Sequence, residues 1–218
     1  MSETTRDGAR RVRASRLALA RAALRPPLKR AIDVTGATAL LLSLAPAFVL
    51  VFLLLCADGG PAFVSRHRVG RGGHEFGLLA FRVPEAKTGS ASSGSVDLGA
   101  ADEERLTRLG RALRWTALDE LPRLLNVLRG DLSLVGPRPV AREDLERSYA
   151  LFGGAAAYLS VRPGLVGPCE ARGGCGGALG ARERVALDAA YAQHPSLRAD
   201  LAILARTAGV LLRRPEAR

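Results

Sequence analysis

The longest hydrophobic stretch of the chain runs from Val34 to Ala57 and contains no charged residue. At about 1.5 Å per residue, an unbroken helix of this length is long enough to cross a bilayer. Pro46 lies within the stretch, and a proline there removes a backbone hydrogen bond and bends the helix. Basic residues flank both ends, and basic clusters mark the cytoplasmic side of a membrane. We therefore predict a re-entrant helix that bends at Pro46, with a straight transmembrane helix as the alternative.

Leucines at helical spacing mark three further segments: residues 103–115, the stretch that follows Pro122, and residues 196–214. Because proline is tolerated only in a first turn, the middle helix should begin near residues 119–121. Short strands are expected over residues 62–65 and within residues 75–81. The pattern predicts a helix-rich α+β fold with a small sheet, the re-entrant membrane helix-break-helix and amphipathic interfacial helices. Three parts follow: a basic N-terminal arm (1–27), the re-entrant membrane hairpin (28–58) and a domain (59–218) that is expected on the cytoplasmic side.

Composition adds a strong preference for anionic partners. The 218-residue chain has a formal net charge of +11, carried almost entirely by arginine, which suits forked contacts to phosphate. Aromatic residues make up only 5% of the chain, without the basic–aromatic alternation of single-strand binders, so we expect no nucleic-acid partner. The three cysteines have no metal-ligand spacing and are expected to be reduced thiols.

Two motifs carry candidate chemistry. Asp119 and Glu120 stand at a predicted helix start, where the helix dipole favours ionised carboxylates, although Asp119 could simply be an N-cap. Arg138 lies between two prolines in Gly136-Pro-Arg-Pro139, so its backbone should be stiff enough to clamp a phosphate, unless it is only a turn residue. Arg162 also precedes a proline.

From Leu118-Asp-Glu-Leu-Pro to Gly136-Pro-Arg-Pro139 the sequence closely resembles the bacterial sugar transferase family, the monotopic phosphoglycosyl transferases. The resemblance covers about residues 28–213, and weaker matches include Lys29-Arg-Ala-Ile-Asp33, Phe81-Arg82 and Leu187-Asp188. It implies an enzyme that moves a sugar-1-phosphate from a UDP-sugar to undecaprenyl (polyprenyl) phosphate, releases UMP and initiates glycan assembly. It also implies a bacterial inner-membrane location, with the catalytic domain on the cytoplasmic face and in contact with membrane lipid. A homodimer is left open.

The resemblance also implies roles for individual residues. Asp119 corresponds to the family's nucleophile and Glu120 to the acid that completes the dyad, with Mg²⁺ bound beside Asp119. Arg138 and Arg162 correspond to residues that bind phosphate or nucleotide. Arg82 and Asp188 are expected to belong to the same phosphate- and nucleotide-binding set.

Two motifs depart from the family pattern. After Phe81-Arg82 the family has a small residue and methionine, whereas Val83-Pro84 follows here. After Arg162-Pro-Gly164 the family has Ile-Thr-Gly, an aromatic residue and Gln-Val, whereas this chain has Leu165-Val-Gly-Pro-Cys-Glu170. Val166 therefore lacks the hydroxyl of the family's threonine. An alternative function is a non-catalytic relative that serves as a membrane scaffold in a glycan-assembly complex, which turnover of a UDP-sugar would distinguish.

Overall fold

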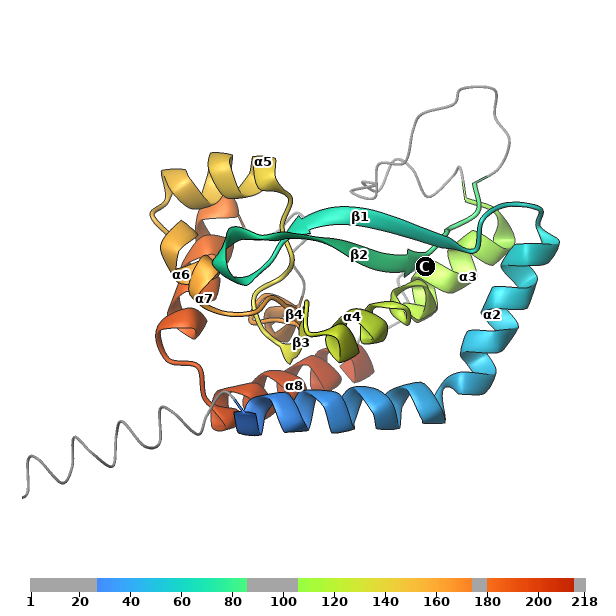
Figure 1. The fold of residues 1–218 in the computed structure, drawn as a ribbon, viewed down its shortest axis with the longest axis horizontal. Coiled ribbons are helices and arrows are strands. Elements are labelled where there is room, and N and C mark those ends of the chain that lie inside the picture. Colours follow the sequence, from blue (N-terminus) through green and yellow to red (C-terminus); the bar gives the residue numbers. More distant parts are fainter. Residues whose placement is uncertain (1–26, 86–105, 174–179, 214–218) are drawn as a thin grey trace, which may run out of the picture.

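The computed structural model describes residues 27–85, 106–173 and 180–213, with side chains described as far as residue 210. The N-terminal helix Pro27–Ser43 leads into α2 (Ala45–Ala57), and together they form a bent pair of helices, here called the hairpin arm (Figure 1). The remaining elements are β1 (Phe63–Val69), η1 (Arg71–Gly73), β2 (Glu75–Phe81), α3 (Arg108–Thr116), η3 (Leu118–Glu120), α4 (Arg123–Arg129), β3 (Ser133–Val135), α5 (Arg142–Asp144), η4 (Leu145–Tyr149), α6 (Ala155–Ser160), β4 (Gly164–Val166), η5 (Glu170–Arg172), α7 (Ala181–Gln193) and α8 (Leu197–Arg213). The predicted N-terminal arm lies outside the described residues.

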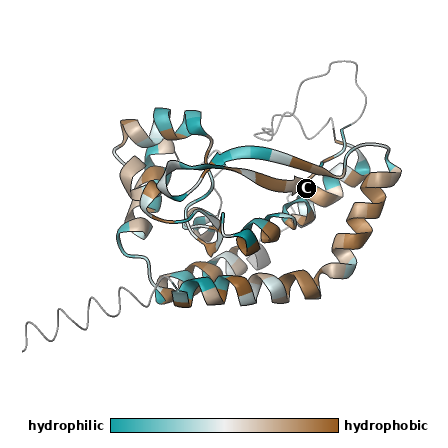
Figure 2. Cartoon of the chain, viewed as in Figure 1, coloured by the Kyte–Doolittle hydropathy of each residue, from teal (hydrophilic) through white to brown (hydrophobic). Residues whose placement is uncertain are grey.

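The N-terminal helix and α2 are bent by 64° at Leu44, which precedes Pro46 by two residues. Pro46 occupies the first turn of α2, where backbone N–H groups have no partner within the helix, so a residue without an N–H is tolerated. Its ring prevents the preceding helix from continuing straight into α2. In the described part of the chain no single helix has both the length and the apolar composition of a membrane span, but the bent pair taken together has both. Figure 2 shows α2 as hydrophobic along its length.

The predicted small sheet is two separate pairs of strands. β1 and β2 pair in antiparallel fashion from Phe63 with Phe81 to Val69 with Glu75, so β1 is longer than the sequence suggested. β3 and β4 form a short parallel pair. In the view of Figure 1, β1 and β2 lie above α4, whereas β3 and β4 lie beside one end of it, and the N-terminal helix and α8 run along the opposite side of the molecule.

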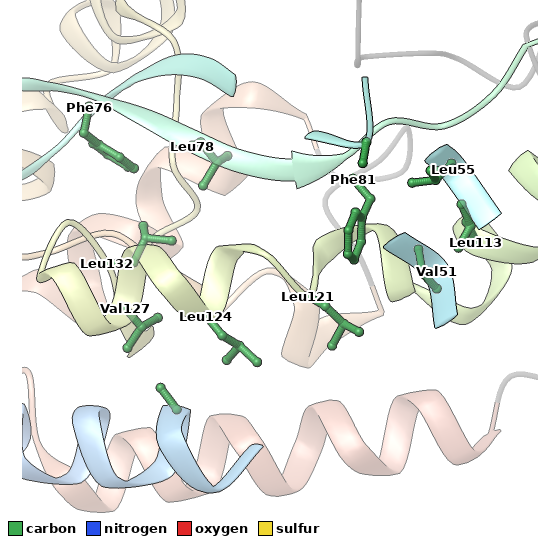
Figure 3. Packing of buried hydrophobic residues seen from close by; sticks show 12 residues of the cluster. Val51, Leu55, Phe76, Leu78, Phe81, Leu113, Leu121, Leu124, Val127 and Leu132 are labelled. Atoms are coloured by element: carbon green, nitrogen blue, oxygen red, sulfur yellow. The ribbon is translucent and has the colours of Figure 1, made fainter. Parts of the chain in front are cut away.

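The main hydrophobic core joins the hairpin arm to the rest of the protein (Figure 3). Val51 and Leu55 of α2 are buried with Phe81 of β2 and Leu113 of α3. Polar contacts support this packing at the other end of the arm: Arg30 donates hydrogen bonds of 2.6 and 2.8 Å to the carbonyls of Val127 and Leu128 at the end of α4. These bonds cap carbonyls that the helix itself leaves unsatisfied.

Cysteine chemistry differs from expectation in one place. Cys56 is an exposed free thiol, but the buried Cys169 is disulfide-bonded, so the prediction of reduced thiols is wrong for this residue. The spacing of cysteines along the sequence does not show whether the fold brings two sulfur atoms within bonding distance.

Candidate active site

Asp119 and Glu120 lie in a 3₁₀ turn, η3, rather than in the first turn of the following helix. The turn begins after Ala117, whose φ of 54° is the single positive φ of a non-glycine residue among the described positions. Left-handed backbone at a residue with a side chain costs about 1–2 kcal/mol, and such strain gathers at functional sites. α4 starts only at Arg123, with Pro122 as its N-cap residue, so the prediction that the dyad opens this helix is wrong.

The electrostatic setting of η3 raises the pKa of the Asp119 carboxyl. Burial, followed by the charge of Glu120, raises the pKa of Asp119 from 3.8 to about 6, while the charges of Arg123 and Arg114 act in the opposite direction. Glu120 itself pairs with Arg123 at 2.9 Å. A carboxyl with a pKa near 6 is ionised at neutral pH, yet it is poorly solvated and therefore well suited to react.

A cavity next to the dyad is lined by five arginines. Arg66 and Arg68 come from β1, Arg123 from α4, Arg138 from the loop after β3 and Arg184 from α7. The other lining residues are Leu78, Ala80, Pro139, Val140 and Asp144. Since Arg123 also pairs with Glu120, the cavity and the acidic dyad adjoin one another. This arrangement fits a ligand with several negative charges, such as a diphosphate.

Close backbone contacts fix the position of Arg138. Gly136 directly follows β3, and Gly164 is the first residue of β4. A Cβ on Gly164 would lie 2.0 Å from the Gly136 nitrogen, so only glycine fits at position 164. The Gly136 N–H donates to the Val166 carbonyl at 3.0 Å, which ties the two segments together. The same contact places Arg138 beside Glu170, with 3.7 Å between Nη1 and Oε1.

Three of the four predicted phosphate- and nucleotide-binding residues do not line this cavity in the described structure. Arg82 donates to the carbonyl of Pro61 at 3.0 Å and to the carboxylate of Asp58 at 2.7 Å, so its guanidinium is occupied at the end of α2. Asp188 is only 1% exposed, and its Oδ2 accepts a 2.5 Å bond from the Tyr149 hydroxyl. Arg162 belongs to the segment that leads into β4, and its side chain is half-buried.

Four of the cavity arginines were not predicted from the sequence as site residues, although the spacing of each gives a weak indication. Arg66 and Arg68 alternate on one strand and therefore share a face, although their charge first suggested a membrane flank. Arg123 follows Glu120 by three residues, and Arg184 precedes Asp188 by four, both spacings that bring helical side chains together.

Within the described residues, the dyad offers two adjacent carboxylates to a divalent cation. No group of three or more His, Cys, Asp or Glu side chains within the described ranges has the geometry of a metal site. Two adjacent carboxylates nevertheless match the way Mg²⁺ binds in phosphate chemistry, where one or two acids and the substrate phosphates supply the ligands.

Comparison with known proteins shows a similarity that extends over most of the chain. Residues 24–214 match the family model described as bacterial sugar transferase. The chain is 40% identical over 188 residues to the UDP-glucose:undecaprenyl-phosphate glucose-1-phosphate transferase of Caulobacter vibrioides, covering 84% of this chain and 69% of that protein. It is 38% identical over 193 residues to the exopolysaccharide production protein ExoY of Rhizobium meliloti, covering 82% and 83%.

A third relative is considerably longer than this chain. The UDP-galactose-lipid carrier transferase of Erwinia amylovora is 37% identical over 199 residues, which is 86% of this chain but 41% of that protein.

Proposed function

The chain belongs to the bacterial sugar transferase family, and on that basis we propose that it moves a sugar-1-phosphate from a UDP-sugar to undecaprenyl phosphate. The product would be the lipid-linked starting unit of a glycan such as an exopolysaccharide. The names of the relatives supply the two substrates and the pathway class. The observation that carries the proposal for this chain is the contact of the dyad, through Arg123, with an arginine-lined cavity.

In the first step, an Asp119 carboxylate oxygen attacks the sugar-bearing phosphorus of the UDP-sugar. The bond from this phosphorus to the bridging oxygen breaks, and UMP leaves with the electron pair. The strained turn at Ala117 and the burial of Asp119 hold the nucleophile in place and keep it poorly solvated. The cavity arginines offset the charge of the diphosphate, which otherwise repels an attacking anion.

In the second step, a phosphate oxygen of the lipid attacks the same phosphorus, and the bond to Asp119 breaks. The carboxylate is restored, and the sugar diphospho-lipid is released. Covalent catalysis replaces a direct reaction between the lipid phosphate and the UDP-sugar, both of which are anions, with two successive displacements. Both displacements take place among the same positive charges. Glu120, held by Arg123 at 2.9 Å, lies beside Asp119 to complete the dyad.

Magnesium is part of the proposal. Asp119, with Glu120 next to it, would hold the ion together with substrate phosphate, and the ion would supply further charge neutralisation. The arginines of the cavity would then bind the phosphate oxygens that the ion leaves free.

The hairpin arm is proposed to insert into the cytoplasmic leaflet and to return to the cytoplasmic side. Several large apolar side chains of the arm are exposed, among them Leu42 at 72% and both Leu50 and Leu53 at 58%. Such exposure is costly in water but not in lipid. Trp115 on α3, at 83% exposed, and Leu201 on α8, at 66%, suit an interfacial position.

Topology is tested by single cysteines placed near residues 25 and 66 in a chain with Cys56 replaced. Labelling of both sites from the cytoplasmic side supports the hairpin, whereas labelling from opposite sides would leave a straight span.

Activity is tested with UDP-glucose and UDP-galactose in the presence of undecaprenyl phosphate and Mg²⁺, scored by UMP release. A covalent route predicts one equivalent of UMP per enzyme before any lipid acceptor is added. Asp119→Asn should abolish this release, while Glu143→Gln, a charge-matched change at an exposed position, should not. Absence of UMP release from every UDP-sugar tested, with a folded wild-type protein, would favour the scaffold alternative.

A further inference from the structure

Asp144 is an unexpected component of the arginine-lined cavity. Among the described residues that line it, Asp144 alone carries a negative charge, against five arginines. It ends α5, directly before the π-helical segment η4. Neither the dyad chemistry nor the binding of phosphate requires a carboxylate at this point, and a carboxylate repels phosphate.

The other acids around the cavity already have partners. Glu120 pairs with Arg123 at 2.9 Å, Glu170 lies 3.7 Å from Arg138, and Asp188 accepts the Tyr149 hydroxyl at 2.5 Å. Within the described part of the chain, the exposed Asp144 carboxylate makes no hydrogen bond or ion pair. Its oxygens are therefore available to a ligand.

The backbone that carries Asp144 is held firmly on both sides. Val140 pairs with Val69 of β1 shortly before α5, and Leu145 is buried immediately after Asp144. At the end of η4, Tyr149 is tied to the buried Asp188 of α7. In Figure 1, α5 and α7 gather at the end of the β1–β2 hairpin that lies away from α2. π-helical segments are rare, and they are frequent at functional sites.

The inference rests on the proposed function, in which the ligand of this cavity is a nucleotide sugar. Such a ligand presents hydroxyl groups as well as phosphates. Carboxylates accept hydrogen bonds from hydroxyls, as acidic residues do for the ribose of dinucleotides in other folds. We propose that Asp144 is a specificity-determining residue that accepts hydrogen bonds from hydroxyl groups of the UDP-sugar, on its ribose or on the transferred sugar.

The test compares Asp144→Asn with Glu143→Gln in the full-length protein. Both changes remove one negative charge from neighbouring exposed positions, but Glu143 does not line the cavity. In Asp144→Asn, the KM for the UDP-sugar should rise about ten-fold, because the neutral amide oxygen cannot accept the charge-assisted hydrogen bond that the carboxylate accepts. Inhibition by inorganic diphosphate, which has no such hydroxyls, should stay equal or become stronger because a repelling charge has gone. Glu143→Gln should change neither value.

Unlabelled UDP, used as a competitor, identifies which hydroxyls are bound. Weaker inhibition of Asp144→Asn by UDP assigns the contact to the ribose, whereas unchanged inhibition by UDP with a raised KM for the UDP-sugar assigns it to the sugar. The inference is overturned if the KM for the UDP-sugar is unchanged or falls in parallel with the diphosphate constant, because Asp144 would then act only as a counter-charge. It is also overturned if diphosphate no longer binds, since Asp144 would then maintain the cavity itself.

Failure of the proposed function is a separate outcome. It appears as a wild-type protein that releases no UMP, whereas failure of the Asp144 inference appears in a wild-type protein that does. Direct calorimetric binding of UDP to both proteins remains informative in either case.

Discussion

Replacing the proposed nucleophile should make the protein more stable, not less. The pKa of Asp119 is raised from 3.8 to about 6, chiefly because the carboxyl is buried and secondly because Glu120 is close. The folded state therefore holds this proton more tightly than the unfolded state, and ionisation opposes folding. In Asp119→Asn the neutral amide has a similar shape and nothing to ionise, so this cost disappears.

The size of the effect follows from the pKa difference. A rise of about 2 units corresponds to about 3 kcal/mol at pH values above both pKa values, and partial exposure of the carboxyl reduces this to about 1–3 kcal/mol. Below 3.8 the acid is protonated in both states and the cost is absent. Between 3.8 and about 6 the unfolded state ionises first, so wild-type stability falls as the pH rises through this window and then levels off.

Denaturant unfolding of purified wild type and Asp119→Asn, measured from pH 4 to pH 8, checks the prediction. The variant should gain little near pH 4 and about 1–3 kcal/mol above pH 6.5, while UMP release is lost at every pH. Glu143→Gln serves as the control for a simple change of net charge. A difference between variant and wild type that does not depend on pH would refute the reasoning, as would a variant less stable than wild type at pH 8.

Three further predictions concern the residues around the dyad. Arg138→Lys keeps the charge but loses the forked geometry, so kcat/KM for the UDP-sugar should fall about ten-fold or more in steady-state assays. Tyr149→Phe leaves the buried Asp188 carboxylate without its 2.5 Å donor and should lower the free energy of unfolding by about 1–3 kcal/mol, measured by denaturant titration. Arg82→Gln should lower the melting temperature without changing inhibition by inorganic diphosphate, because Arg82 braces α2 and lies outside the cavity; weaker inhibition would restore its predicted phosphate role.

Features that depend on residues close together in the chain could be predicted from the sequence. An uncharged run interrupted by Pro46 predicted a bent helix, because the missing N–H of a proline acts within one helical turn. The family was predicted from the stretch around Asp119 and Arg138 and is confirmed by the match over residues 24–214. The α8 prediction was also close, since leucine spacing and the Ser196 hydroxyl, which accepts from the Ala199 N–H at 3.2 Å, both act along one helix.

Residue roles that depend on distant contacts could not be read in this way. Asp188 looks like a site acid in sequence, but its burial beneath Tyr149 requires η4 to pack against α7. Arg82 looks like a phosphate ligand, but its partners are the carbonyl of Leu55 in the last turn of α2 and the carbonyl of Pro61 shortly after the helix. A cavity built from β1, α4, α7 and the loop after β3 has no local pattern at all, because only tertiary packing brings these segments together.

The contacts of Arg82 indicate that the hairpin arm helps to position the active site, in addition to its proposed role as a membrane anchor. η3, which carries the dyad, packs against both α2 and β2, and Leu118 joins the same core as Phe48 and Phe52 of α2. Arg82, directly after β2, binds the end of α2, and Arg30 binds the end of α4, so two arginines hold the arm against β2 and α4. If the arm inserts into the membrane as proposed, a rigid connection of this kind would set the depth of Asp119 relative to the lipid surface. If so, Arg82→Gln should reduce transfer to undecaprenyl phosphate more than it reduces the first release of UMP from the UDP-sugar, because only the second step needs the lipid phosphate at the correct height. Equal loss of both steps would show that Arg82 supports the fold of the site without setting its position at the membrane.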